Sequence, residues 1–315
     1  MSRSSGRKIS LIPTSAHISA TSSSASDHVL NVHEHFFLID CGEGTQIQLR
    51  KYKIKFSRIN HIFISHMHGD HVFGLPGLFS TFNLLGRKND LYVYGNSQLE
   101  HLINFFLQHF GNDLHYKIRF VSVHSKRQVV IYEDKHVVVE SLPLKHRIPA
   151  TGFLFREKEG ERSMIKEMIE KYQLSISDIV KIKNGNDHVT PAGLVIPNTH
   201  LTIPPYKGRS YAYCSDTMFY QRLAERIKDI DLLYHEATFL DKEKKLARLT
   251  MHSTAMQAAT IAKEAGAGTL IIGHFSSRYD DTSELLDEAR AMFGNTLPAE
   301  EGRVYDVPRV RKQKE

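Results

Sequence analysis

The stretch SHMHGDHVFGLPGL, residues 65–78, places four metal-binding side chains within six positions. They are His66, His68, Asp70 and His71. This HxHxDH pattern is far more specific than a lone histidine pair, which more often caps a loop or fills a core. A purely structural zinc site would be closed and usually rich in cysteine, and neither cysteine of the chain has the spacing of a zinc ligand pair. The stretch therefore predicts a metal centre with chemical activity.

The local geometry divides these four residues between two ions. The preceding segment, INHIFISH (59–66), is apolar and predicts a strand. At its end His66 and His68 are two residues apart, so both point to one side and can reach one ion. Asp70 and His71 follow a glycine turn and would face a second ion. Because zinc takes about four donors, the rest of the chain must supply more ligands.

Three further residues are candidates for completing the two sites. His146, Asp216 and His274 each stand at the end of a predicted strand. A carboxylate has two oxygens and can bridge two cations, so Asp216 is the natural bridge. Nitrogen and oxygen donors without thiolate suit Zn²⁺ and also permit Mn²⁺. We expect two zinc ions per subunit.

Strands and helices alternate along most of the chain, and the polar candidates lie at strand ends. Open α/β sheets bind their ligands at the carboxyl ends of strands, so an α/β fold is expected. Helices are predicted after Pro76, over 97–111 and over 252–266. The predicted strands lie within 8–13, 28–46 (two strands that turn at His33 and Glu34), 59–66, 90–95, 127–146 (two strands), 209–217, 231–238 and 268–279.

Residues 156–206 interrupt this alternation and predict an arm inserted into a single domain of residues 1–315. The segment starts with a charged helix and continues in loops that contain four prolines. Between residues 156 and 190 it holds seven basic and seven acidic residues, so we expect a charge-balanced arm.

Composition sets limits on compartment and partners. The chain has a net charge of +6 and a pI of about 9.1, which fits a polyanionic partner such as nucleic acid. Its two cysteines are far apart in sequence, which favours a reducing, cytoplasmic compartment. No apolar run is long enough to span a bilayer. The first 26 residues are rich in serine and contain no acidic residue. This composition fits a transit peptide as well as it fits a strand, KISLIP, followed by a polar loop.

With these residues in place, the sequence resembles the metallo-β-lactamase superfamily and, within it, the ribonuclease Z family of tRNA 3′-processing endonucleases. HEAT and HST are motifs that a β-lactamase or glyoxalase-like relative would not be expected to have. The matching motifs are DCGEGTQ (40–46), SHMHGDHVFGLPGL (65–78), PLKHR (143–147), CSDT (214–217), HEAT (235–238), HST (252–254) and HFSSRY (274–279).

The resemblance implies a four-layer αβ/βα sandwich and a set of ligands for two zincs. It also implies a homodimer in which the inserted arm of one subunit holds precursor tRNA while the other subunit cuts it. The family's arm usually carries a Gly-Pro-rich basic tip, which this chain lacks. The implied ligands are His66, His68 and His146 for one metal, Asp70, His71 and His274 for the other, with Asp216 as the bridge.

Two metal ions near each other activate a water and clamp the oxygens of a phosphodiester. Asp70 would be both a ligand and the general base. Asp40, in DCGEGTQ, would orient a ligand histidine through its second nitrogen; it would also close the CGEG turn.

The leaving ribose 3′-oxygen is strongly basic and needs a proton. His252, oriented by Glu236, is the candidate acid; the alternatives are a histidine at a helix start and a buried glutamate satisfied by backbone. Ser276 and Arg278 follow the last ligand and are candidates to hold substrate phosphate, or they form a solvated loop.

Three functions fit these residues. The first is a zinc endoribonuclease that leaves a 3′-hydroxyl on the tRNA and a 5′-phosphate on the trailer. The second is a hydrolase of small phosphodiesters or sulfate esters on the same fold. The third is a non-catalytic RNA-binding relative, against which the complete ligand set argues.

Overall fold

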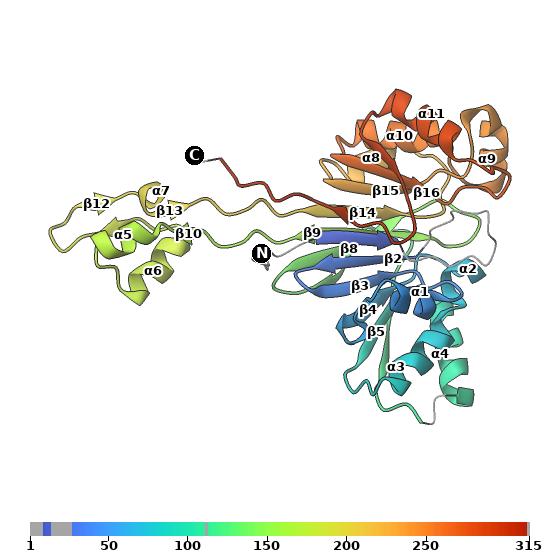
Figure 1. The fold of residues 1–315 in the computed structure, drawn as a ribbon, viewed down its shortest axis with the longest axis horizontal. Helices are drawn as coiled ribbons and strands as arrows, with labels where there is room; N and C mark the ends of the chain where they lie inside the picture. Colours follow the sequence, from blue (N-terminus) through green and yellow to red (C-terminus); the bar gives the residue numbers. More distant parts are fainter. Residues whose placement is uncertain (1–8, 14–26, 111–112, 314–315) are drawn as a thin grey trace. The chain divides into compact units, whose positions relative to one another are not determined.

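The computed structural model of the chain, shown in Figure 1, describes residues 9–13, 27–110 and 113–313. Most of the serine-rich N-terminal segment, with the transit-peptide hypothesis, lies outside the described residues. The chain forms two compact units. We call residues 1–156 with 210–307 the body, and residues 157–209 with 308–315 the arm unit. Among the described residues, no helix is long and apolar enough to cross a membrane.

The first sheet of the body has seven strands in the order β18-β1-β2-β3-β4-β5-β6. Strands β3 to β6 are parallel, so their carboxyl ends meet at one edge. The predicted turn between β2 and β3 is confirmed, with positive φ at His33 and Glu34. The bounds are β1 (Ile9–Pro13), β2 (His28–Val32), β3 (His35–Ile39), β4 (Ile59–Phe63), β5 (Leu91–Gly95), β6 (Ile118–Ser122) and β18 (Tyr305–Asp306).

The second sheet has seven strands in the order β17-β16-β15-β14-β9-β8-β7. Strands β14 to β17 are parallel, while β9 is antiparallel to β14. The bounds are β7 (Val130–Glu133), β8 (Val137–Pro143), β9 (Thr151–Glu157), β14 (Ser210–Cys214), β15 (Leu232–Glu236), β16 (Thr269–Gly273) and β17 (Thr296–Pro298).

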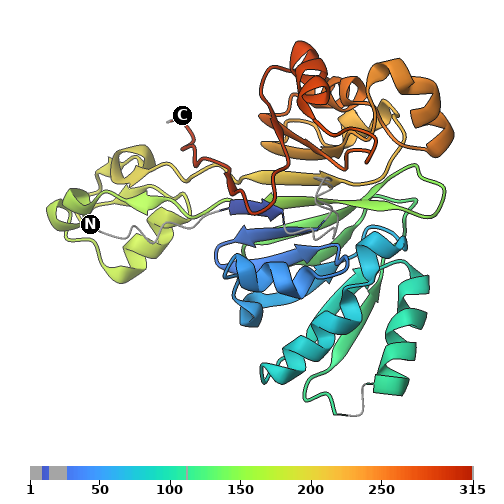
Figure 2. The same cartoon turned by 45° about the vertical axis from the view of Figure 1, so that its right-hand side comes forward.

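Helices cover the outer face of each sheet, and the two sheets pack against each other (Figures 1 and 2). One buried apolar cluster lies between the sheets, and one lies under each helical layer, so the body is the expected four-layer αβ/βα sandwich. The helices are α1 (Thr45–Lys51), α2 (Gly69–Val72), α3 (Leu75–Leu84) and α4 (Ser97–Phe110) by the first sheet, and α8 (Arg222–Arg226), α9 (Lys244–Thr250), α10 (Ala255–Glu264) and α11 (Ser283–Met292) by the second, with 3₁₀ turns η1 (Phe56–Arg58) and η2 (Asp241–Glu243).

Several elements of the body were not predicted from the sequence, among them β6, β9 and α11. Strand β9 is buried along its first five residues and lies inside the second sheet, between β14 and β8. A short, continuously apolar run of this kind carries no period that identifies it.

The arm unit has its own small core of Leu174, Ile182, Ile196 and Leu201. The sequence predicted one charged helix followed by loops, but a second helix, α6, begins at a capping box formed by Ser175. The elements are β10 (Ser163–Met164), α5 (Lys166–Lys171), α6 (Ile176–Lys183), β11 (His188–Val189), β12 (Val195–Ile196), α7 (Asn198–Leu201) and β13 (Thr202–Ile203).

Two glycines allow the loop after β3 to lie against the segment after β4. A Cβ atom on Gly42 would collide with the carbonyl oxygen of Asp70, and one on Gly74 would collide with the carbonyl oxygen of Gly42. Backbone hydrogen bonds join the same segments, from Cys41 N to His71 O at 2.8 Å and from Gly74 N to Cys41 O at 2.9 Å. The glycines of DCGEG and FGLPG therefore fix the position of the histidine-rich segment.

We expect Gly74→Ala to destabilise the fold by about 1–3 kcal/mol, as overpacking does, because the colliding atoms are backbone and cannot rotate away. Urea unfolding followed by circular dichroism measures this. The control is Gly294→Ala, where a Cβ atom meets nothing within 4 Å and the change should stay within about 0.5 kcal/mol. Equal stability of the two variants would show that the close approach is not required.

Candidate metal centre

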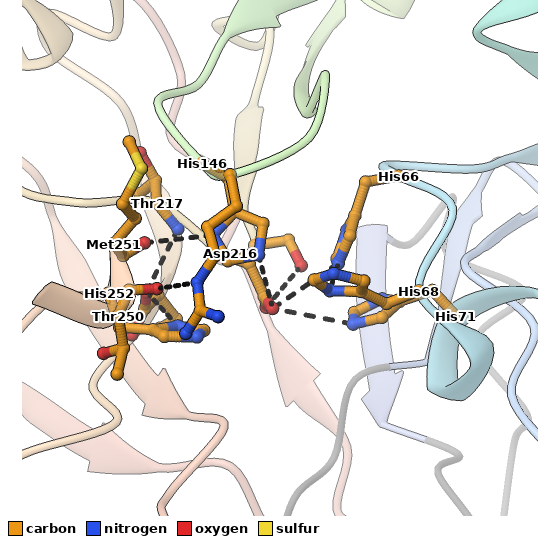
Figure 3. A network of polar contacts seen from close by, with 12 residues as sticks. His66, His68, His71, His146, Asp216, Thr217, Thr250, Met251 and His252 are labelled. Carbon is orange, nitrogen blue, oxygen red and sulfur yellow. Dashed lines mark hydrogen bonds and ion pairs between the residues drawn. The ribbon is translucent and has the colours of Figure 1, made fainter.

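All seven candidate ligands come from the carboxyl ends of strands in the two sheets. The parallel halves of both sheets end at the same place, which brings residues far apart in sequence together. Figure 3 shows the Asp216 carboxylate between His146 and the histidines of the 66–71 segment. The candidate ligands are His66, His68, Asp70 and His71 after β4, His146 after β8, Asp216 after β14 and His274 after β16.

The first donor set faces one oxygen of the Asp216 carboxylate. Asp216 Oδ2 lies 3.4 Å from His66 Nε2 and 3.8 Å from His146 Nε2. His68 Nδ1 lies 3.0 Å from His66 Nε2. These four donor atoms lie within 4.8 Å of one another.

The second donor set faces the other oxygen. Asp216 Oδ1 lies 3.3 Å from His274 Nε2 and 3.8 Å from His71 Nε2. Asp70 Oδ2 lies 3.3 Å from His71 Nε2. With Asp216 shared between them, each set therefore contains four donors, the number that zinc prefers.

The protein holds the second nitrogen of His66 and of His71, and so decides where the proton of each ring lies. His71 Nδ1 donates to Asp40 Oδ2 at 2.8 Å. His66 Nδ1 lies 2.9 Å from the Ser65 hydroxyl, which already donates its hydrogen to Asp40. The hydroxyl must then accept from His66 Nδ1. Both rings therefore direct an unprotonated Nε2 toward Asp216 when they are neutral.

His146 and His274 are held in the same way by partners from the second half of the chain. His146 Nδ1 donates to the carbonyl oxygen of Met251 at 3.0 Å, just after α9. His274 Nδ1 lies 3.0 Å from the Thr238 hydroxyl, which donates to Glu236 and must accept from the ring. Nε2 of His146 is buried and makes no hydrogen bond among the described residues. A buried ring nitrogen without a hydrogen-bond partner is expected where that nitrogen binds a metal ion and the other ring nitrogen is held by the protein.

The Asp40 carboxylate fixes the positions of His66 and His71 through hydrogen bonds. It is fully buried and accepts hydrogen bonds from the Ser65 amide at 2.7 Å, the Ser65 hydroxyl at 2.7 Å and His71 at 2.8 Å. A fourth comes at 2.7 Å from the hydroxyl of Tyr213, which belongs to β14 of the other sheet. The predicted role of Asp40 in orienting a ligand histidine matches this geometry. Nothing in the sequence pointed to Tyr213.

Three residues of the site have a left-handed backbone although none is glycine. The φ angles are +58° at Asp40, +59° at Met251 and +59° at His274. Such conformations cost on the order of 1 kcal/mol or more and persist where the surroundings over-determine them. Asp40 and Met251 each accept a hydrogen bond from a candidate ligand ring, and His274 is itself a candidate ligand.

The charges of the site suit divalent cations. Burial favours the protonated form of Asp216, but the neighbouring His274 and His66 outweigh it and hold the pKa of this carboxyl well below its usual range. Burial lowers the pKa of His146 to about 4, and it also lowers the pKa of His68. His71 differs, because burial favours its neutral form but the charges and hydrogen bonds of Asp40 and Asp70 outweigh burial and raise the pKa of His71. Its ring then carries a second proton, which a bound cation would displace. An ionised carboxylate and neutral imidazoles are the forms that bind metals. The donor set therefore fits a divalent metal centre.

His252 and the fully buried Glu236 form a pair beside the donor sets. His252 Nδ1 lies 2.9 Å from Glu236 Oε1. That carboxylate also accepts from the amides of Thr217, Ser253 and Thr238 and from the Thr238 hydroxyl. Burial opposes the charged form of His252, but the charge and hydrogen bond of Glu236 outweigh it and raise the pKa of His252. The pair can hold a proton on His252 Nε2, which faces the site.

Ser276 and Arg278 are already engaged with other side chains. Arg278 Nε donates to the Ser276 hydroxyl at 3.1 Å, and Arg278 Nη1 pairs with Glu243 at 3.0 Å. The guanidinium also lies over the ring of Phe239, 5.1 Å from its centroid. Their proposed contact with substrate phosphate stays a prediction, and it would require Arg278 to leave Glu243.

A cavity of about 680 Å³ opens beside His252 and was not foreseen from the sequence. Lys245 and Arg248, both on α9, line it without a carboxylate partner among the described residues, and Phe219 and Met218 add apolar surface. The DKEKK run at 241–245 was the available signal. The cavity therefore presents cations and apolar surface beside His252.

Comparison with known proteins finds a matching family model, sequence relatives and similar solved structures. The family model described as Anti-Pycsar protein Apyc1 matches residues 8–285. The ribonuclease Z of Bacteroides fragilis is 49% identical over 292 residues, 93% of this chain and 94% of that protein. The solved short form of human tRNase Z is 27% identical, with a TM-score of 0.66 over 95% of this chain and 99% of that chain. The metallo-β-lactamase fold protein YhfI from Bacillus subtilis, 17% identical, shares the fold, with a TM-score of 0.65 over 96% of this chain and 100% of that chain.

We expect His68→Ala to lower the divalent metal content of the purified chain, because it removes one of the four donors of the first set. Elemental analysis after dialysis measures the loss. His101→Ala, which removes an exposed histidine of α4, is the control and should keep the parent's content. Full metal content in His68→Ala would remove His68 from the ligand set.

Proposed function

The chain belongs to the ribonuclease Z family, and from that membership we infer that it is a metal-dependent endoribonuclease that removes the 3′ trailer from precursor tRNA. The observation that carries the mechanism is the Asp216 carboxylate, whose two oxygens face two separate donor sets. The products are a tRNA with a 3′-hydroxyl and a trailer with a 5′-phosphate.

The proposal assigns two zinc ions to the centre. One would be held by His66, His68 and His146 and the other by Asp70, His71 and His274, with Asp216 shared. Nitrogen-rich sets of four donors without thiolate support zinc over magnesium or calcium, which prefer oxygen. When bound there, the ions would lower the pKa of a water toward about 7 and clamp the attacking and leaving oxygens of a phosphodiester.

Asp70 is the proposed general base. Its side chain is about one-third exposed, so it meets solvent while His71 contacts its Oδ2 oxygen. Burial raises the pKa of this carboxyl, but the hydrogen bond and charge of His71 outweigh burial and lower the pKa below its usual range. Asp70 is therefore ionised at neutral pH and can accept a proton from the attacking water.

His252 is the proposed general acid, and Glu236 is the residue that positions it. The hydrogen bond from Nδ1 to Glu236 fixes the ring and leaves Nε2 to donate toward the leaving 3′-oxygen. His252 packs between His146 and His274, with ring centroids at 5.0 and 5.3 Å, so it lies at the edge of both donor sets.

We propose a homodimer in which the arm unit of one subunit holds the tRNA that the other subunit cuts. We place the enzyme in the cytoplasm, where the free thiols of Cys41 and Cys214 stay reduced.

The direct test is incubation of the purified chain with a precursor tRNA that carries a 3′ extension, followed by mapping of the product ends. Cleavage immediately 3′ of the mature tRNA, with a 3′-hydroxyl on the tRNA, is expected at low enzyme concentration. Hydrolysis of bis(nitrophenyl) phosphate without cleavage of the precursor would instead favour a hydrolase of small phosphodiesters. Tight RNA binding without hydrolysis of either substrate would favour a non-catalytic relative.

We expect His252→Ala to lose precursor-tRNA cleavage by about 10²–10⁴-fold, the range typical of general acid catalysis. The same variant should keep most of its activity on bis(nitrophenyl) phosphate, because nitrophenolate is a weak base and leaves without a proton. Cleavage rates on both substrates and the metal content of the variant are the measurements.

Asp70→Ala provides the contrast for this prediction. It removes a ligand and the proposed base together, so both activities should fall. If His252→Ala lost both activities equally with its metal content unchanged, His252 would be a residue that positions phosphate and not the acid.

A further inference from the structure

The C-terminal residues 308–313, which we call the tail strand, belong to the arm unit and not to the body. They run antiparallel to residues 205–207 (Figures 1 and 2), with a β-bridge between Tyr206 and Arg311. Lys207 N donates to Val310 O at 2.9 Å, and Lys312 N donates to Pro205 O at 3.1 Å. The tail therefore adds an extended strand to the base of the inserted segment.

Two arginines of the tail strand share one aromatic ring. The guanidinium carbon of Arg309 lies 4.4 Å from the ring centroid of Tyr206, and that of Arg311 lies 4.2 Å from it. Arg311 Nη1 also donates to the carbonyl oxygen of Pro204 at 2.9 Å. Because residues two apart on a strand face the same way, both side chains lie on one face and both are held by the same ring.

Neither arginine has a carboxylate within ion-pair distance among the described residues, and both arginines are exposed. Lys312 differs, since its Nζ pairs with Glu159 at 2.8 Å. Exposed cations that are pre-ordered yet unpaired are suited to an anionic partner.

The tail strand also changes the charge of the arm unit. Residues 157–209 carry eight basic and seven acidic side chains, a net charge of +1. Residues 308–313 add three cations and no acid, which brings the unit to +4. The sequence-based expectation of a charge-balanced arm counted only residues 156–190 and missed this contribution from the chain terminus.

We propose that the tail strand supplies the phosphate-binding strip of the arm unit, with Arg309 and Arg311 contacting the backbone of precursor tRNA. The inference rests on the proposed function, since it takes RNA as the partner. A guanidinium binds phosphate through two parallel N–H donors. The Cα atoms of residues two apart on a strand lie about 6.6 Å apart. This distance is comparable to the separation of neighbouring phosphates in an RNA strand. Stacking on Tyr206 reduces the side-chain freedom lost on binding.

The test compares the double variant Arg309→Gln/Arg311→Gln with the parent in tRNA-binding titrations over a range of salt concentrations. Losing two phosphate contacts should make the plot of log K against log salt shallower by about 1.4–1.8 and weaken binding at 0.1 M salt by roughly tenfold or more. Arg309→Lys/Arg311→Lys keeps both charges and should restore most of the slope. Lys228→Gln/Lys263→Gln removes two exposed cations from the body and is the matched control.

Two further measurements separate this inference from the proposed function and from a structural role of the tail. All variants should hydrolyse bis(nitrophenyl) phosphate like the parent, because the body is unchanged. If the parent does not bind or cut precursor tRNA, the proposed function itself fails. If the parent does so but the glutamine variant keeps its salt slope, while truncation after Val307 weakens binding, the tail is only a structural strand and the inference is overturned. It is also overturned if the control loses as much slope as the glutamine variant.

Discussion

The buried carboxylate of Asp216 is the feature on which the rest of the site depends. One of its oxygens faces His66 and His146, and the other faces His71 and His274. When these rings are neutral, their protons are committed to partners on the far side of each ring, so each ring presents a bare nitrogen to the carboxylate. Divalent cations between the rings and the carboxylate would match these unprotonated nitrogens. The geometry therefore supports a metal centre, in which Asp216 is the proposed shared ligand.

The fold serves this requirement through the meeting of two sheets. Asp40 from the first sheet is held by Tyr213 from the second, so the carboxylate that fixes His71 also links the two sheets at the site. The end of α9 plays the matching part for His146 through the carbonyl of Met251. The candidate ligands at the strand ends are thus held by the packed core of the sandwich. The arm unit is separate and has its own core and its own charges.

The sequence predicted the parts of this arrangement that have a local signature. The histidine motif, the strand-end positions of Asp216 and His274, and the alternation of strands and helices could all be read from spacing. Tyr213 and the Met251 carbonyl could not, because a buried tyrosine and a backbone oxygen look like any others until the fold brings them to a ligand ring. The tail strand was missed for a similar reason: its arginines lie about a hundred residues after Tyr206, and only the fold joins them.

Anomalous X-ray diffraction at the zinc absorption edge, from crystals of the purified chain, tests the central claim most directly. The account predicts two anomalous peaks, one beside each oxygen of Asp216, the first among His66, His68 and His146 and the second among Asp70, His71 and His274. A single peak, or metal held anywhere other than between these residues, would contradict a centre in which Asp216 is shared by two ions.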